Sequence, residues 1–388
     1  MSYDMRNYLN PRRLTIAMWD GAYMIRRNPG DRFKDWERSL EELKERGYNT
    51  IRIDAFPGII DPKNPDMEYT WPEINRQYMP WCWIHEYTTK PARDLVEFIN
   101  LASKKGIYLT LSAWWEAMGL RVIPRDTMEA AEMWIRLLEF LKAETGLENI
   151  VFVDLCNEIP GFLPGYDKQL ENAKYDTPIE TDTEAARITA APPVSGSWNS
   201  NQLAFLKNTL DGSLKLVQKA FPEHRFTYSM NMNSAFGDVG FQNLDLIDMH
   251  FFLSDQRFDT RTNFGEFMKD AYETSKNFKD FSDRCKKTIK SVGPMMRQMQ
   301  RSQLKWASEY AQKIGAPLVT TEAWASWFYV DHSDLDWDWI NDWCESAIDD
   351  AIEYGLWGIT TYNYAEPHFD TWKDVKWHLR LNEKFLNS

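Results

Sequence analysis

The sequence has few of the residues that mark a metal site, a disulfide scaffold or a nucleic-acid surface. It contains only 4 cysteines and 6 histidines in 388 residues. No two cysteines form a Cys-x-x-Cys pair, which disfavours a zinc knuckle and a dense disulfide framework. The cysteines are Cys82, Cys156, Cys285 and Cys344. Lys and Arg number 45 against 58 Asp and Glu, a net charge of -13 without a long basic block. A surface that follows phosphate groups is therefore not expected, and nucleic acid is a poor candidate partner.

Long hydrophobic runs are also missing. No stretch approaches the ~20 apolar residues that cross a bilayer, so we expect no membrane partner. The first apolar stretch follows Arg12 and Arg13, is interrupted by Asp20, and lacks a small-residue cleavage site. We interpret it as a strand rather than a signal peptide. The expected location is then the cytoplasm, or the exterior if a signal has already been removed.

Aromatic residues, by contrast, are abundant: the chain has 18 Trp, 17 Tyr and 21 Phe. One explanation is a large core, because aromatic side chains contribute much of the energy of packing. The other is a binding site whose rim offers flat apolar faces to a ligand. Four tryptophans fall at helical spacing and predict core packing: Trp36, Trp134, Trp306 and Trp343.

Short β-rich runs alternate with amphipathic helical segments along the whole chain. The predicted strands are Leu14–Trp19, Asn49–Phe56, Ile107–Trp114, Ile150–Asn157, Arg225–Met230, Leu244–Phe251, Pro317–Glu322 and Trp357–Tyr362. Several are continuously apolar, as expected for parallel strands that are covered on both faces. The pattern predicts the α/β class and a (β/α)8 TIM barrel that forms one domain over residues 1–388. A doubly wound open sheet is less favoured, because no glycine-rich phosphate turn follows the first strand.

The chain is longer than the ~250 residues of a typical barrel. The excess lies in three segments that follow strands, Pro57–Lys90, Ile159–Ser197 and Leu253–Pro294. We predict them as long βα loops on the face where barrel enzymes carry their active sites. Five glycines that stand just before strands predict helix ends: Gly47, Gly106, Gly146, Gly315 and Gly355.

Polar and aromatic residues follow nearly every predicted strand, and in a barrel these positions converge on one pocket. They are Trp19, Asp20, Arg52, Asp54, Trp114, Trp115, Glu116, Asn157, Glu158, His250, Glu322, Trp324, Tyr362, Asn363 and Tyr364. Glu158 and Glu322 end strands four and seven, which lie across the barrel from each other. Two carboxyl groups about 5–5.5 Å apart are what retaining glycoside hydrolysis requires. We therefore predict Glu158 and Glu322 as catalytic residues, with Arg52 close enough to Glu322 to favour its ionised form.

The motifs around these residues resemble the clan of (β/α)8 retaining glycoside hydrolases, of the cellulase-like (glycoside hydrolase family 5) type. The matching segments are TIRIDAF with Arg52, DLCNEIP with Asn157 and Glu158, IDMHFF with His250, and VTTEAW with Glu322. The resemblance implies that Glu158 is the acid/base and Glu322 the nucleophile. It further implies that Asn157 binds the sugar hydroxyl beside the anomeric carbon. The chain departs from the family pattern after strand three, which lacks a His, and after strand six, where Phe252 replaces the usual Tyr.

The distribution of aromatic residues supports a sugar ligand, because sugar rings pack their C–H faces on aromatic planes. We predict eight substrate-binding residues: Arg52, Asn157, His250, Trp19, Trp114, Trp115, Trp324 and Tyr362. Further aromatic residues in the long loops are equally compatible with stacking and with packing: Tyr69, Trp71, Tyr78, Trp81, Trp83 and Trp327.

The predicted function is therefore a retaining glycosidase that acts on β-linked glycosides or oligosaccharides, with a carbohydrate partner and no cofactor or metal. Two alternatives remain open. A non-catalytic carbohydrate-binding barrel would show the same aromatic residues, so that only activity separates it from an enzyme. A metal-dependent barrel hydrolase would need His-x-His on strand one, which LTIAMWD lacks.

Overall fold

The computed structural model describes residues 9–71, 86–115, 122–159, 161–163, 165–174, 199–231, 243–253, 256–264, 278–326 and 332–388. At its centre is a nine-stranded sheet in the order β7-β6-β5-β2-β1-β11-β10-β9-β8, in which neighbouring strands are parallel. The strands are β1 (Leu14–Asp20), β2 (Thr50–Asp54), β5 (Tyr108–Ser112), β6 (Ile150–Asp154), β7 (Phe226–Thr227), β8 (Met230–Asn231), β9 (Ile247–His250), β10 (Leu318–Thr320) and β11 (Gly358–Thr360).

The two ends of this sheet belong to one short segment of the chain. Only Tyr228 and Ser229 separate β7 from β8, yet β7 pairs with β6 and β8 pairs with β9. The run Phe226–Asn231 therefore acts as a single barrel strand that closes the sheet. Each of the eight predicted strand runs overlaps at least one observed strand, and the predicted (β/α)8 barrel is confirmed.

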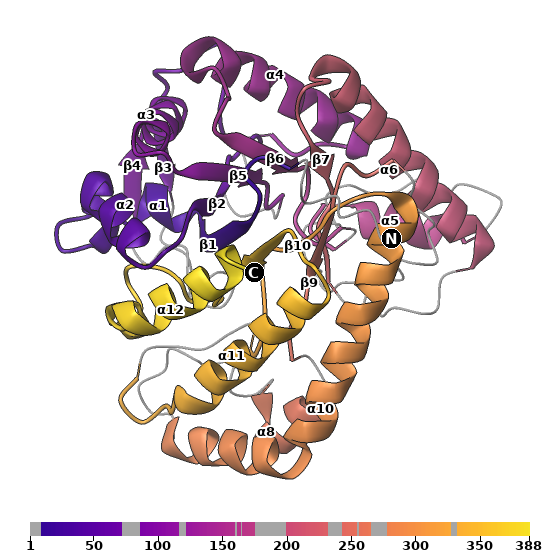
Figure 1. Cartoon of the computed structure of the whole chain (residues 1–388). Coiled ribbons are helices and arrows are strands. Elements are labelled where there is room, and N and C mark those ends of the chain that lie inside the picture. Colours follow the sequence, from indigo (N-terminus) through magenta and orange to yellow (C-terminus); the bar gives the residue numbers. More distant parts are fainter. Residues whose placement is uncertain are drawn as a thin grey trace.

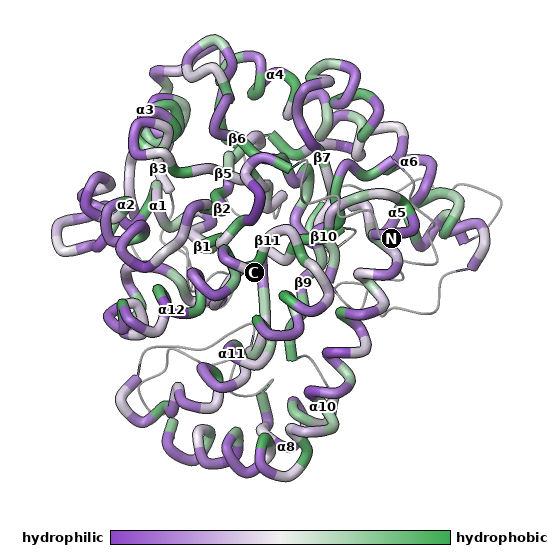
Figure 2. The backbone as a smooth tube through the Cα atoms, viewed as in Figure 1, coloured by the Kyte–Doolittle hydropathy of each residue, from purple (hydrophilic) through white to green (hydrophobic). Residues whose placement is uncertain are grey.

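Helices surround the strands on the outside (Figure 1). The longer ones are α2 (Trp36–Glu45), α3 (Pro91–Lys104), α4 (Thr127–Thr145), α6 (Ser200–Ala220), α10 (Phe278–Ile314), α11 (Asp338–Glu353) and α12 (Val375–Leu386). Shorter elements are α1 (Ala22–Ile25), α5 (Tyr166–Asn172), α8 (Gln256–Thr262), the 3-10 helices η2 (Arg32–Lys34) and η4 (Asp370–Lys373), and the antiparallel pair β3 (Tyr69–Trp71) and β4 (Tyr87–Thr89). The helices change repeatedly between hydrophilic and hydrophobic colouring along their length, as amphipathic helices do (Figure 2). Among the described helices, none is both long enough and apolar enough to span a membrane.

The predicted helix ends are confirmed at all five glycines, which have φ angles between 69° and 84°. Gly146 shows the reason: it caps α4 in the left-handed conformation, and its N–H reaches the Lys142 carbonyl. All three predicted loops contain some regular structure: β3 and β4 lie in the first, α5 in the second, and α8 with part of α10 in the third. α8 and the first half of α10 occupy much of Leu253–Pro294, because Phe278, Phe281 and Cys285 form one buried helical face that continues past Pro294.

The interior of the barrel is apolar away from the strand ends that carry polar residues. A small buried cluster joins Ile16 of β1, Phe152 of β6 and Val319 of β10, together with Trp357, which precedes β11. β1, β6 and β10 are not neighbours in the sheet, so these side chains meet through the barrel interior. The larger core cluster includes Trp36, Trp134 and Trp343, as predicted. The expectation for Trp306 is wrong: it is 43% exposed on the outer side of α10, stacked with Tyr310.

One side chain of α10 fastens this helix to the ends of two strands. Gln300 is buried, and its Nε2 donates 2.9 Å hydrogen bonds to the carbonyls of Phe251 and Trp324. Its Oε1 accepts a 2.9 Å hydrogen bond from Nε1 of Trp343. The two carbonyls lie directly after His250 and close behind Glu322, so Gln300 supports the segments on which those residues stand.

Replacing Gln300 by leucine should lower the free energy of unfolding by about 3–5 kcal/mol, because it leaves two carbonyls and one indole N–H buried without partners. The measurement is chemical denaturation of the full chain. Gln298→Leu is the matched control, since Gln298 is exposed on the same helix and its loss should change stability by less than about 0.5 kcal/mol. Equal effects of the two substitutions would contradict this role.

Candidate active site

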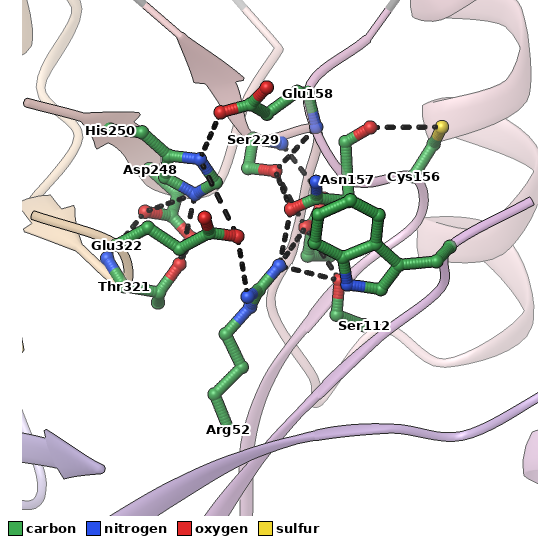
Figure 3. Close-up of polar contacts among 12 residues, drawn as sticks. Arg52, Ser112, Cys156, Asn157, Glu158, Ser229, Asp248, His250, Thr321 and Glu322 are labelled. Carbon is green, nitrogen blue, oxygen red and sulfur yellow. Dashed lines mark hydrogen bonds and ion pairs between the residues drawn. The ribbon is translucent and has the colours of Figure 1, made fainter. Parts of the chain in front are cut away.

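Arg52 lies at the centre of a buried polar network at the carboxyl ends of the strands (Figure 3). Its Nη1 donates to Oδ1 of Asp20 at 2.9 Å and to Oε1 of Glu322 at 2.7 Å. Its Nη2 donates to Oγ of Ser112 at 3.2 Å and to Oδ1 of Asn157. Burial alone would lower the pKa of Arg52, but the carboxylates of Asp20 and Glu322 outweigh it and raise the pKa above its usual value. The guanidinium is therefore charged and connects residues from five barrel strands.

Glu158 follows β6 and points toward His250 of β9 (Figure 3). Nδ1 of His250 lies 2.8 Å from Oε1 of Glu158, and Nδ2 of Asn231 donates to Oε2 at 3.3 Å. The Glu158 side chain retains 13% exposure, whereas the His250 side chain is fully buried. Solvent or a ligand therefore has access to Glu158, while His250 is reached only through its neighbours.

Glu322 follows β10, and its carboxyl group also lies beside His250. Besides its 2.7 Å contact with Arg52, its Oε1 lies 3.7 Å from Nδ1 of His250. Glu158, His250 and Glu322 each offer one oxygen or nitrogen atom within 4.8 Å of the other two. Two carboxyl groups and an imidazole thus share one small volume at the strand ends.

The ionisation of these groups is set by burial and by their mutual charges. Burial raises the pKa of Glu322 to about 7, although His250 and Arg52 act in the opposite direction. Arg52 is within ion-pair reach of Glu322 and favours its ionised form, as expected, but desolvation outweighs the guanidinium. Burial alone would lower the pKa of His250, but Glu322, Glu158 and Asp248 raise it to about 9. His250 is accordingly an imidazolium at neutral pH.

Two buried aspartates each accept two hydrogen bonds from a Ser or Thr residue near the adjacent strand, one from its backbone N–H and one from its hydroxyl group. Asp154 of β6 accepts hydrogen bonds from N and Oγ of Ser229 at 2.8 and 2.7 Å, and Ser229 Oγ in turn accepts from Glu158 N at 3.0 Å. Asp248 of β9 accepts from N and Oγ1 of Thr321 at 3.0 and 2.7 Å. Each aspartate therefore fixes a segment that carries or contacts one of the two glutamates.

The structure brings together five of the ten predicted site residues: Arg52, Asn157, Glu158, His250 and Glu322. Asn157 is fully buried, and its Oδ1 faces Arg52. Its Nδ2 has no hydrogen-bond partner among the described residues. This N–H group is therefore a buried donor whose hydrogen bond is not made within the described residues.

Four of the five predicted aromatic residues lie in the core instead. Trp19 packs against Phe33 and donates to the Ala365 carbonyl, and Trp115 donates to the Leu155 carbonyl. Trp324 stacks on Phe251, with its ring centroid 5.9 Å away, and donates to the Thr360 carbonyl. Tyr362 packs against Trp377 and His378 of α12. All four are at most 1% exposed, so packing accounts for them without a ligand.

Trp114 is the predicted aromatic residue that stays partly exposed. Its ring meets Phe162 edge to face at 4.8 Å, and its backbone N donates to Oδ2 of Asp54 at 3.1 Å. Burial raises the pKa of Asp54 to about 8. In the predicted loop cluster, Trp71 is buried in the core and Tyr69 is partly exposed. The remaining aromatic positions and one acid lie outside the described residues: Tyr78, Trp81, Trp83, Glu116 and Trp327.

Several residues of this polar network were not predicted from the sequence. Asp154 and Asp248 lie inside apolar strand runs, and Ser112, Ser229 and Thr321 are common strand residues. A signal was nevertheless available, because an aspartate within a buried strand must be paired or hydrogen-bonded to be tolerated there. Its presence in both IVFVD and IDMH could have indicated a polar network at these strand ends.

Comparison with known proteins identifies a family and similar folds. The model of a family described as sugar-binding cellulase-like matches residues 16–386. A candidate glycoside hydrolase from Parabacteroides distasonis has 26% sequence identity and a TM-score of 0.76, with 96% of this chain and 93% of that chain covered. A GH5_18 protein from Bifidobacterium longum has 12% identity and a TM-score of 0.52, with 97% and 80% covered. No curated protein matches the chain.

Replacing Arg52 by glutamine should raise the pKa of Glu322 by about 1–3 above its value of about 7, because the nearest cation is lost. Carbon-13 NMR of glutamate-labelled protein, with the signal assigned through Glu322→Gln, measures this directly. Arg52→Lys is the matched control, since it keeps the charge, and it should raise the pKa less. A Glu322 pKa unaffected by Arg52→Gln would show that Arg52 does not govern this carboxyl group.

Proposed function

The chain belongs to the sugar-binding cellulase-like family, and we propose that it is a retaining glycoside hydrolase that cleaves β-linked glycosides or oligosaccharides. The observation that carries this proposal is the proximity of Glu158 and Glu322, whose carboxyl oxygens approach within 4.8 Å. Retaining enzymes have carboxyl groups about 5–5.5 Å apart, whereas inverting enzymes need about 6.5–9.5 Å to admit a water molecule between them. The short separation favours the retaining mechanism.

The roles of the two carboxylates follow from their surroundings. Glu322 is nearly buried and bound to Arg52, so we assign it as the nucleophile that attacks the anomeric carbon. Glu158 is more exposed and faces His250 and Asn231, so we assign it as the acid/base. In the first step Glu158 protonates the departing oxygen while Glu322 forms the glycosyl ester. In the second step Glu158 takes a proton from water, which attacks the same carbon and releases Glu322.

The remaining residues of the network are suited to binding a sugar. The unpaired Nδ2 of Asn157 can donate to a hydroxyl beside the anomeric carbon, since its Oδ1 is already held by Arg52. The partly exposed ring of Trp114 offers an apolar face to the C–H side of a sugar. The recognised partner would then be a carbohydrate, with polar contacts at the reacting ring and stacking beside it.

Glu158, His250 and Glu322 could also be considered as ligands of a metal ion, since their donor atoms cluster. The contacts of these atoms argue against this alternative. The guanidinium of Arg52 already binds Oε1 of Glu322 at 2.7 Å, and Oε1 of Glu158 lies 2.8 Å from Nδ1 of His250, so these donor atoms already have partners within the chain. We therefore propose hydrolysis by the carboxylates themselves.

The pH dependence of kcat/KM should report the ionisation of Glu322. Its pKa of about 7 means that the nucleophile is increasingly protonated as the pH falls, so kcat/KM should decrease about tenfold for each pH unit below 7. An aryl β-glycoside with a good leaving group is the appropriate substrate, because it depends little on protonation by Glu158. An acidic limb near 4.5, the ordinary glutamate value, would contradict the effect of burial.

Substitution should separate the two catalytic roles. Glu322→Ala should abolish turnover, and added azide should give the glycosyl azide of inverted configuration. Glu158→Ala should lower kcat by about 10²–10⁴ for poor leaving groups, and azide should release the glycosyl-enzyme as the azide of retained configuration. The anomeric configuration of the products is determined by NMR. The assays are run with and without EDTA, because loss of activity in EDTA would indicate a metal-dependent reaction.

Glu309→Ala, at an exposed position on α10, is the control and should match the unaltered chain. Inverted azide from the Glu158 variant would mean that the roles are exchanged. Full activity of both variants would refute the assignment of this pair. Sugar binding without turnover by the unaltered chain would favour a non-catalytic carbohydrate-binding barrel.

A further inference from the structure

The hydroxyl group of Thr321 lies between Asp248 and His250. It has a single proton to donate, and the carboxylate of Asp248 can only accept a hydrogen bond. Oγ1 of Thr321 lies 2.7 Å from Oδ2 of Asp248 and 3.2 Å from Nε2 of His250 (Figure 3). The pKa of Asp248 is about 6, so above that pH it is a carboxylate without a proton to donate. The Thr321 proton therefore points to Asp248, and the free lone pairs of Oγ1 face His250.

This arrangement determines where the protons of His250 lie. Because Oγ1 of Thr321 can only accept from the ring, Nε2 must carry a proton. The other nitrogen, Nδ1, is 2.8 Å from Oε1 of Glu158 and 3.7 Å from Oε1 of Glu322, and both groups attract a proton to it. His250 is thus held as a donor at both nitrogens, with one N–H directed at Thr321 and the other at Glu158.

The two oxygens of Glu158 consequently differ. Oε1 receives the short hydrogen bond from His250, whereas Oε2 receives only the 3.3 Å contact from Asn231. A carboxyl oxygen that is held by a cationic donor is a poor site for an acidic proton. The less tightly held oxygen keeps a lone pair available for proton exchange.

We propose that Asp248 and Thr321 are positioning residues, which hold His250 as a double donor so that Glu158 is anchored through Oε1 and exchanges its proton through Oε2. This inference rests on the glycosidase function proposed above. In the first step the Oε2–H bond breaks as the leaving oxygen gains the proton. In the second step Oε2 gains a proton from water, and His250 keeps both ring protons throughout.

The charged groups that face His250 all favour its cationic form. They are Glu158 after β6, Glu322 after β10 and Asp248 on its own strand β9. Arg52 contacts Glu322 rather than the imidazole. Asp248 is the one carboxylate among the three that has no part in the proposed chemistry, so it can be changed without removing a reacting group.

The test is a proton–nitrogen-15 NMR titration of His250 in the full chain labelled at histidine. The ring should titrate near pH 9 in the unaltered protein. Asp248→Asn should lower the midpoint by about one pH unit or more, because it removes a charge and leaves Thr321 only one of the two acceptor oxygens that it uses. Thr321→Val should lower it as well, since the methyl group fills the place of the hydroxyl and leaves Nε2 without an acceptor. Thr321→Ser keeps the hydroxyl and should restore the midpoint to within about 0.3 pH unit.

Asp248 acts on His250 both directly, with Oδ1 3.9 Å from Nε2, and through Thr321. Because the two residues share this second route, the double variant should shift the midpoint by less than the sum of the two single shifts. For a glycoside with a poor leaving group, the alkaline limit of kcat should move to lower pH in Asp248→Asn. An unchanged His250 midpoint in both single variants, or a proton found on Nδ1 alone, would overturn the inference. The NMR result does not depend on turnover: shifts without hydrolysis would refute the proposed function and leave the His250 geometry standing.

Discussion

The site depends on one buried cation. A guanidinium that is fully removed from water is tolerated only when its hydrogen bonds are matched by well-placed acceptors. Arg52 meets this requirement at Nη1 and Nη2, with acceptors from four other strands or the segments that follow them, namely Asp20, Ser112, Asn157 and Glu322. Its Nε has no hydrogen-bond partner among the described residues. The strand ends cannot move independently without leaving this charge unpaired. The positions of Asn157 and Glu322 are therefore fixed before any ligand arrives, which is the preorganisation that electrostatic catalysis requires.

The acids around Arg52 are arranged in a repeated pattern rather than as isolated pairs. Asp154 holds Ser229 through N and Oγ, and Asp248 holds Thr321 through N and Oγ1. In both cases an aspartate of one strand captures a hydroxyl residue of the next strand around the barrel. Burial raises the pKa of Asp248 to about 6 and that of Glu322 to about 7, and neighbouring acids add to the effect. One carboxyl group of this cluster can thus change its protonation state near neutral pH.

The barrel could be predicted from the sequence because apolar strand runs alternate with amphipathic helices. The two glutamates could be predicted as site residues because each stands at the end of an apolar strand run. It was insufficient for the aromatic residues. Successive strand residues point to opposite sides, so a polar residue that faces the pocket has an aromatic neighbour that faces the helices. Buried Trp19 precedes Asp20, which contacts Arg52. Buried Trp115 likewise follows Trp114, which is partly exposed. Only the register, which depends on contacts distant in sequence, identifies the inward member of each pair.

The backbone at Glu158 shows how the barrel places a side chain where a regular strand would not. Glu158 has a φ of 46°, in the left-handed region, which costs of order 1–2 kcal/mol for a residue with a Cβ atom. Hydrogen bonds on both sides hold it there: Asn157 N donates to the Ala113 carbonyl, and Glu158 N donates to Ser229 Oγ. Ser229 is itself held by Asp154. Glu158 is therefore fixed by Ala113, which follows β5, and by Ser229, which lies between β7 and β8. This backbone conformation places the carboxyl group beside His250 of β9, and Asp154 supports it through Ser229.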